Sequence, residues 1–297
     1  MDYLKSEHLK FKRTISNKLI FIVPLITAIF AWLMGGYIGY QYMTLYWWYA
    51  FLLPGAIAIL CSLSHRKEEN AGKYYSVFSM PVNLSRFEFA KGIILVEKLL
   101  VSAIFLALLI SISNIIAPAT AVYSLLHSIT GSIGIILASV WQIPLCLYLA
   151  RKTGMFVPIV LNTILGIVLS TATALGNTIA WWFVPYCWAA KLAEPLMGIE
   201  INGTYAGNCG FSIAIMISIS LSILLFLILF YPMPTQRIFP KGGRQKWVLF
   251  MRFVLNRKKR SIHRFGLFIF VYPLWGHCYF LLTIPSMPAP QTVKSSK

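Results

Sequence analysis

Long apolar stretches alternate along the chain with short segments that hold nearly all of its charged residues. A bilayer hydrocarbon core of about 30 Å needs about 20 apolar residues per helix, and within lipid a helix satisfies its own backbone hydrogen bonds. Six stretches meet this requirement, namely 19–37, 46–63, 99–117, 127–150, 155–176 and 209–232. The pattern therefore predicts an all-α polytopic membrane protein with six transmembrane helices.

A further apolar run, "FGLFIFVYPLWGHCYFLLTI", occupies residues 265–284 within a basic C-terminal tail. It is long enough for a seventh span, but it contains Pro273, Gly276 and His277. A seventh span, a hairpin lying on the membrane surface and a tail altered by a change of reading frame all stay open. We therefore divide the chain into a membrane domain at 1–240 and an extension of unknown role at 241–297.

Connections rich in Lys and Arg alternate with connections that hold almost none. The basic segments are the first 18 residues, 64–98, 151–154 and the part that follows the sixth span. The segments poor in basic residues are 38–45, 118–126 and 177–208, the last of which has Lys191 alone. Because Lys and Arg accumulate in cytoplasmic loops, both ends of the six-span core are expected in the cytoplasm. The formal charge of +18 then reflects topology and attraction to anionic lipid, and no nucleic-acid partner is expected.

The N-terminal segment "MDYLKSEHLKFKRTIS" repeats apolar positions at Leu4, Phe11 and Ile15. This spacing predicts an amphipathic helix that lies in the cytoplasmic headgroup layer before the first span. A basic leader that is merely solvated is the alternative. The basic residues expected at the membrane interface are Lys5, Lys10, Lys12 and Arg13.

Residues 64–98 form the largest predicted cytoplasmic segment inside the six-span core. It begins with the mixed charges of "HRKEENAGKYYS", Pro81 marks a turn, and Ser85 and Glu88 have the spacing of a capping box. We predict two short helices around this turn, held at the membrane surface. Their charges could simply be solvated, or they could fit a cleft on a soluble partner through charge-assisted contacts.

Several kinds of chemistry lack the residues that they need. None of the eight Asp and Glu residues lies at the middle of a predicted span, which argues against a proton-driven transporter. The chain has no GxxxxGK[ST] loop, no HExxH motif and a single Asp, so an intramembrane enzyme is not expected. We therefore expect no catalytic residue, cofactor or metal in this chain, and any ATP must bind to another chain. Among five cysteines without metal-ligand spacing, Cys187 and Cys209 flank one predicted outer loop and could pair.

That outer loop contains the aromatic stretch "WWFVPYCW" at 181–188. One interpretation is an aromatic belt that anchors a short re-entrant or interfacial helix. The other is a surface that contacts an amphipathic peptide in the outer leaflet. The residues of this second interpretation are Trp181, Trp182 and Trp188.

An ordered set of short motifs runs through the membrane domain. They are "SEHLKFKRT" at 6–14, Lys18, Leu19, Pro24, "WWYAFLLPG" at 47–55, Lys67–Glu68, Pro81 and Lys91. In order, spacing and predicted topology over about residues 1–240, the chain resembles the E-type permease subunit of the lantibiotic self-immunity and bacitracin-resistance exporters, an ABC-2 type family. Residues 241–297 have no counterpart in that family.

The resemblance implies a permease, itself not an enzyme, that expels cationic antimicrobial peptides from a bacterial plasma membrane. It implies two kinds of partner, a second related permease and a cytoplasmic ATPase that binds ATP and Mg²⁺. It places the contact with the ATPase on the first cytoplasmic loop and on the "RKTG" turn, which here means Arg66, Lys67, Glu68, Glu69, Arg151 and Lys152. The alternative is a non-transporting membrane scaffold or sensor whose cytoplasmic loop binds a signalling partner.

Overall fold

The structure is a computed structural model that describes residues 2–11, 14–70, 84–172, 178, 181–207 and 209–230. The chain divides into two units, Met1–Phe239 and Pro240–Lys297, and every described residue belongs to the first. This described part is helical and has no strand beyond one isolated antiparallel bridge between Ile199 and Tyr205. The predicted extension at 241–297, with its apolar run, lies outside the described residues.

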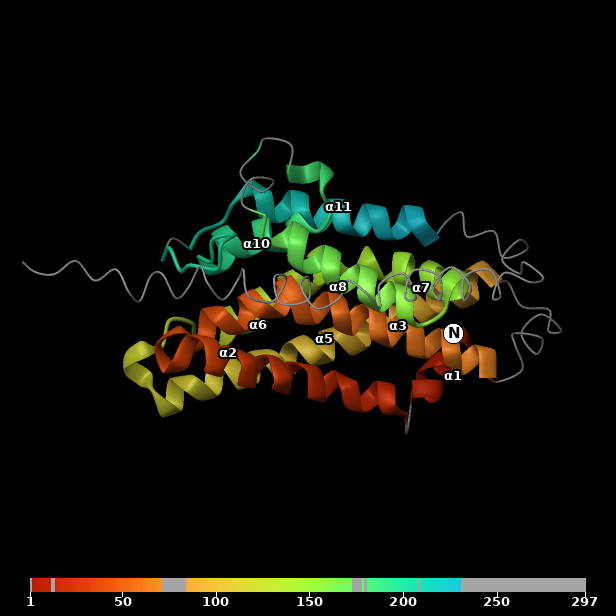
Figure 1. The fold of residues 1–297 in the computed structure, drawn as a ribbon, viewed down its shortest axis with the longest axis horizontal. Coiled ribbons are helices and arrows are strands. Elements are labelled where there is room, and N and C mark those ends of the chain that lie inside the picture. The colour runs from red at the N-terminus through yellow and green to blue at the C-terminus, as the bar shows by residue number, and fades with distance from the viewer. Residues whose placement is uncertain are drawn as a thin grey trace, which may run out of the picture. The chain divides into compact units, whose positions relative to one another are not determined.

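The helices of the first unit run alongside one another (Figure 1). They are α1 (Asp2–Phe11), α2 (Ile15–Trp47), the π-helical segment η1 (Trp48–Leu52), α3 (Leu53–Asn70), α5 (Leu84–Ile116), the 3-10 turn η2 (Pro118–Thr120), α6 (Leu125–Ser139), α7 (Gln142–Thr153), α8 (Phe156–Ser170), the 3-10 turn η3 (Trp181–Phe183), α10 (Cys187–Met197) and α11 (Ile213–Phe230). Among the described residues, three helical stretches are long and apolar enough to cross a membrane: Ile15–Asn70, Arg86–Ile116 and Ile213–Phe230. The bent pair of α6 and α7 makes a fourth if it is one span.

The 56-residue helical stretch Ile15–Asn70 reverses its direction at Gly36. This residue has φ 57° and ψ −156°, a backbone conformation open to glycine because it lacks a Cβ atom. The rings of Phe30 and Trp47 lie 5.0 Å apart, whereas a straight helix would separate them by about 25 Å. Residues 15–35 and 37–70 therefore form two limbs of a helical hairpin.

The backbone at Gly36 leads to a prediction about stability. We expect Gly36→Ala to lower the free energy of unfolding by about 1–3 kcal/mol, because a Cβ atom is strained in this conformation. Gly210 has open space around it and no positive φ, so Gly210→Ala should change stability by less than about 0.5 kcal/mol. Thermal unfolding in detergent micelles compares the two variants. An equal effect of both would contradict the assigned turn.

Pro24 lies inside α2, whereas Pro144 lies near a bend and Pro54 next to a change in helix type. A proline inside a helix lacks the N–H and its ring clashes with the carbonyl four residues earlier. Pro24 frees the carbonyl of Ile20 in this way, and Ser102 Oγ donates a hydrogen bond to it at 2.8 Å. Pro144 lies four residues after Val140, where α6 and α7 meet at an angle of 47°. The predicted fourth span is therefore a bent pair of helices. Pro54, in turn, follows the π-helical segment η1.

The segment between the second and third predicted spans differs from expectation. The short helices predicted within 64–98 are the ends of long ones, since α3 continues to Asn70 and α5 begins at Leu84. Glycine and proline are absent from residues 56–70 and 84–91, so nothing in either stretch interrupts a helix. The predicted turn at Pro81 lies outside the described residues.

The fifth predicted span, 155–176, corresponds to α8. This helix has 15 residues, fewer than the roughly 20 that a straight crossing of the hydrocarbon core needs. Residues 173–176, the last part of the prediction, lie outside the described residues. Helix α11 occupies the place of the sixth predicted span.

The core lies around the second limb of the hairpin and α10. Trp48, Leu53 and Ile57 of the second limb are buried, while Leu25 and Trp32 of the first limb are exposed. Exposed apolar side chains are also frequent along α5, α8 and α11. In a membrane protein such faces contact lipid or another membrane subunit.

Helix α10 belongs to the part predicted as an outer loop, yet it packs against α6, α8 and α11. Just before it, Tyr186 Oη donates a hydrogen bond of 2.7 Å to Asn162 Oδ1. Asn162 Nδ2 in turn donates to Gln142 Oε1 at 3.0 Å and to the carbonyl of Pro54 at 2.7 Å. The polar side chain of Tyr186 therefore reaches the bend between α6 and α7.

Candidate functional site

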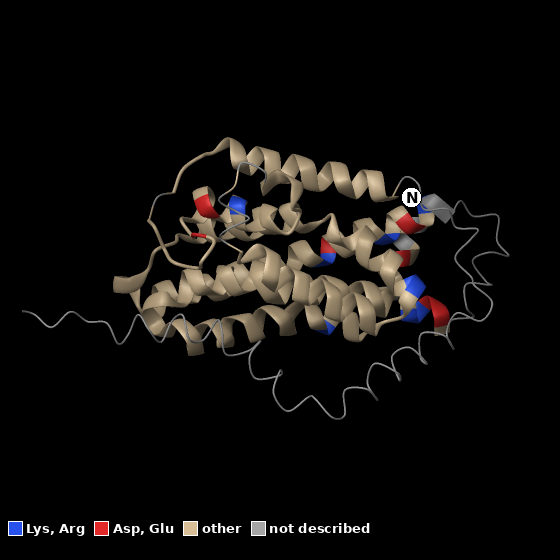
Figure 2. Cartoon of the chain, turned by 45° about the horizontal axis from the view of Figure 1, so that its top comes forward, with Lys and Arg blue, Asp and Glu red and all other residues tan. Residues whose placement is uncertain are grey.

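Charged residues gather toward one end of the described helices (Figure 2). Helix α1, the end of α3, the start of α5 and the end of α7 supply them. A much smaller charged group, on α10 and the segment after it, lies toward the opposite end. The larger group contains the residues predicted to contact an ATPase, and we call it the basic end.

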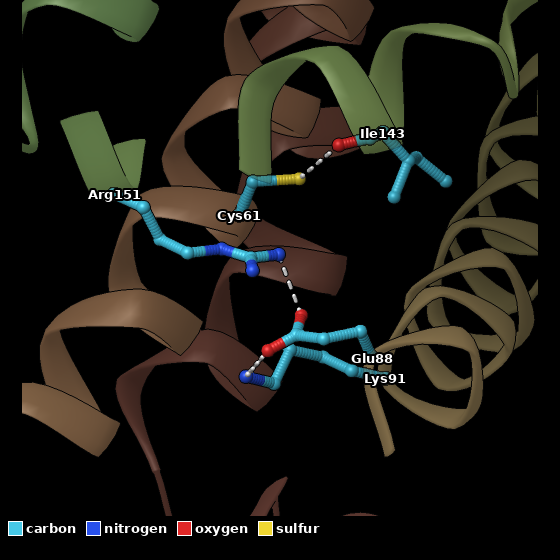
Figure 3. A network of polar contacts seen from close by, with 5 residues as sticks. All are labelled: Cys61, Glu88, Lys91, Ile143 and Arg151. Atoms are coloured by element: carbon cyan, nitrogen blue, oxygen red, sulfur yellow. Dashed lines mark hydrogen bonds and ion pairs between the residues drawn. The ribbon is translucent and has the colours of Figure 1, made fainter. Parts of the chain in front are cut away.

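A buried carboxylate lies between two cations at the basic end (Figure 3). Arg151 Nη2 donates a hydrogen bond of 2.7 Å to Glu88 Oε2, and Lys91 Nζ lies 3.7 Å from Glu88 Oε1. Their side chains are exposed by 9% for Arg151, 4% for Glu88 and 1% for Lys91. Lys91 Nζ also lies 4.9 Å from the centre of the Phe87 ring. These contacts join the start of α5 to the end of α7.

Further contacts join the end of α3 to the same region. Cys61 Sγ donates to the carbonyl of Ile143 at 3.7 Å, and Ser62 Oγ donates to the carbonyl of Met155 at 3.3 Å. The end of α3, the start of α5 and the turn between α7 and α8 are therefore connected.

The six residues predicted to contact an ATPase have different environments. Glu68 is buried, Glu69 is half-buried, and Arg151 turns inward toward Glu88. The exposed members are Arg66, Lys67 and Lys152. Of the six predicted residues, those with exposed side chains are thus all basic.

Helix α1 packs against α5, and it shares a small hollow with the end of α3. Glu7 and Phe11 are buried and line a small hollow together with Lys67 and Glu68. Leu4 is exposed, although the sequence placed it on the same apolar face as Phe11. Contact of α1 with the headgroup layer stays a prediction. Nothing is described for the side chains of Lys5 and Lys10, and Lys12 and Arg13 lie outside the described residues.

The three tryptophans of the outer stretch do not share one surface. Trp188 is buried and donates through Nε1 to the carbonyl of Trp182 at 3.0 Å. Trp182 is exposed and stacks on Phe183, and Trp181 lines a cavity. The possible pairing of two cysteines is not formed, because Cys187 and Cys209 are both free.

One comparison with known proteins decides the family. The family model for the ABC-2 family transporter protein matches residues 3–169, more than half of the 297-residue chain. The chain belongs to the ABC-2 transporter family. No curated protein and no solved structure matches it. The matched part of this ABC-2 permease extends from α1 into α8 and includes the whole Glu88 network.

Membership in the ABC-2 transporter family confirms the general prediction of a membrane permease. An ABC-2 permease is a multi-pass membrane component of transport and works with an ABC ATPase on another chain. The resemblance to an ABC-2 permease is thus confirmed, while the narrower likeness to E-type subunits stays a prediction. Among the described residues of the permease, no group of three or more His, Cys, Asp or Glu side chains could hold a metal ion.

Proposed function

We propose that this ABC-2 permease is a subunit of an exporter that expels cationic antimicrobial peptides of the lantibiotic type from a bacterial plasma membrane. A second, related permease would complete the membrane part. ATP and Mg²⁺ would bind to cytoplasmic ATPase subunits. The family match supports the exporter, and the ordered motifs that resemble E-type subunits support the peptide substrate.

The proposed topology has six spans with the N-terminus in the cytoplasm. The reversal at Gly36 supports counting the two limbs, 15–35 and 37–70, as separate spans. The remaining spans would be α5, the bent pair of α6 and α7, α8 and α11. This arrangement puts the basic end on the cytoplasmic side, as the distribution of Lys and Arg favours.

The observation that carries the coupling part of the proposal is the buried Glu88 network. Residues 64–98 connect the end of α3 to the start of α5, and the network joins this start to the end of α7. An ATPase bound at the basic end could therefore displace several spans together. Closure of the ATPase on ATP would then change access to a path or outer-leaflet groove between the two permeases.

The proposal is tested in a peptide-sensitive Gram-positive cell that produces the permease pair with its ATPase. We expect survival at a several-fold higher concentration of a cationic lantibiotic, with less labelled peptide retained by the cells. An ATPase variant that binds ATP but does not hydrolyse it is the control. Equal survival with the active and the inactive ATPase, at equal amounts of permease in the membrane, would refute the export function.

A further inference from the structure

A cavity of about 470 Å³ opens between α10, the start of α11 and the turn η3. Its walls include Trp181, Lys191, Glu194 and Glu200. It belongs to the smaller charged group in Figure 2, away from the basic end. None of the contacts proposed for the ATPase involves it.

The charged residues of a long, otherwise uncharged part of the sequence all line this cavity. Across residues 99–150 and 153–230, the sequence has three Asp, Glu, Lys or Arg residues, and they are Lys191, Glu194 and Glu200. All three line this one cavity. Glu194 is 42% exposed and Glu200 is exposed, so the charge of both stretches is concentrated at one accessible place.

The three charges do not cancel. Lys191 Nζ lies 2.6 Å from Glu194 Oε2, with side-chain exposures of 14% for Lys191 and 42% for Glu194. Glu200 Oε2 accepts a hydrogen bond of 2.7 Å from Thr204 Oγ1. Two carboxylates against one ammonium group leave a net charge of −1 in the cavity, which attracts a cation.

The loop that carries Glu200 is held in place by its backbone. Glu200 N–H donates to the carbonyl of Thr204 at 2.9 Å, and Ala206 N–H donates to the carbonyl of Gly198 at 2.8 Å. Gly198 closes α10 in the left-handed conformation, with φ 65°. The loop therefore places Glu200 in the wall of the same cavity as the Lys191–Glu194 pair, and little ordering of its backbone is needed when a ligand binds, which lowers the cost of binding.

Trp181 supplies the aromatic part of the cavity wall. Ammonium and guanidinium groups bind carboxylates through charge-assisted hydrogen bonds, and they also bind aromatic faces. A ligand that combines such a cation with an apolar chain would use both kinds of wall. An amphipathic peptide rich in lysine or arginine has this chemistry.

We propose that this cavity binds a lysine or arginine side chain of a cationic amphipathic peptide and thereby recognises the substrate at the outer face. The inference rests on the proposed function, because it names the feature of the peptide that the permease selects. Glu194 and Glu200 attract the cation, Trp181 contacts it, and Lys191 competes with it for Glu194. Lys191 therefore sets how strongly the site attracts a cation.

The test measures binding to the purified full chain in phosphatidylcholine nanodiscs. The probe is a fluorescently labelled amphipathic peptide of lysine and leucine, and protein-free nanodiscs supply the background. We expect Glu194→Gln with Glu200→Gln to weaken the Kd by about three- to tenfold, the worth of one or two exposed charge pairs. The matched control is Glu97→Gln at the basic end, which should leave the Kd unchanged. Added salt should weaken wild-type binding more than binding to the double variant.

Lys191→Gln gives an opposite expectation. Removal of the competing ammonium should tighten peptide binding, whereas a merely structural role of Lys191 would weaken it or leave it unchanged. Size-exclusion chromatography checks that each variant remains folded. Equal affinities of wild type and double variant would overturn the site but not the exporter. Binding that follows these expectations, in a permease that confers no ATP-dependent resistance, would support the site and overturn the exporter function.

Discussion

Replacing Glu88 with glutamine (Glu88→Gln) is expected to lower the free energy of unfolding by about 3–5 kcal/mol, the usual effect of removing one partner of a buried ion pair. The carboxylate faces Arg151 Nη2 at 2.7 Å and Lys91 Nζ at 3.7 Å, with all three side chains nearly inaccessible to solvent. Glutamine keeps the shape but loses the charge that compensates both cations. Denaturant or thermal unfolding in detergent micelles measures the loss.

The matched control for this prediction is Glu97→Gln. Glu97 pairs with Lys98 at 3.0 Å, but its side chain is 45% exposed, and exposed pairs are worth about 1 kcal/mol or less. A double-mutant cycle with Arg151→Gln isolates the contact itself. We expect the loss in the double variant to be smaller than the sum of the two single losses. Similar small losses for Glu88→Gln and Glu97→Gln would show that the network does not stabilise the basic end.

Much of the fold could be predicted because lipid imposes a simple length requirement on apolar stretches. The predicted spans 19–37 and 99–117 fall on α2 and α5 for this reason. The connection predicted at 38–45 is instead helical. The chain needs no loop there, because it reverses its direction at one residue, Gly36. Hydrophobicity reports how long a helix can be, but it does not report how sharply the chain turns.

The length of apolar stretches alone could not predict that α10 is buried. Its 11 residues are too few for a span, so the sequence placed them in an outer loop. Gly134 on α6 allows close approach, because a Cβ atom there would lie 3.2 Å from Leu192 Cδ2. The polar residues Asn162 and Tyr186 carried a usable signal, since polar groups inside a membrane protein need partners. Which partners they find depends on tertiary contacts.

The Glu88 network shows the same limit at the candidate site. The sequence predicted that Glu88 would cap its own helix, but its carboxylate contacts Arg151, which is 63 residues away in the chain. Local spacing identifies caps and i,i+3 pairs, such as Glu88 with Lys91. It does not identify which helix ends meet in space. Resemblance to a family turn points to Arg151, whereas Lys91 belongs to the ordered motifs without a predicted role.

The basic surface of the proposed ATPase contact should be sensitive to charge reversal. Arg66 and Lys67 are exposed at the end of α3, whereas Glu68 is buried. A partner that fits this surface should present acidic groups, so Arg66→Glu with Lys67→Glu would place like charges opposite each other, which costs several kcal/mol. We expect the amount of ATPase that co-purifies with the permease to fall by about tenfold or more.

Two comparisons decide whether this loss is specific. Lys18→Glu changes an exposed basic residue outside the predicted contact, so ATPase recovery should stay at the wild-type level. Wild-type recovery should fall as salt is added, because screening weakens exposed charge contacts. Since the side chains of the reversed residues are exposed, the variant should lose less of its melting temperature than Glu88→Gln. Full recovery of the ATPase by the reversed variant would show that Arg66 and Lys67 do not take part in the coupling contact. Lys152 would then be the remaining exposed basic residue of the proposed set.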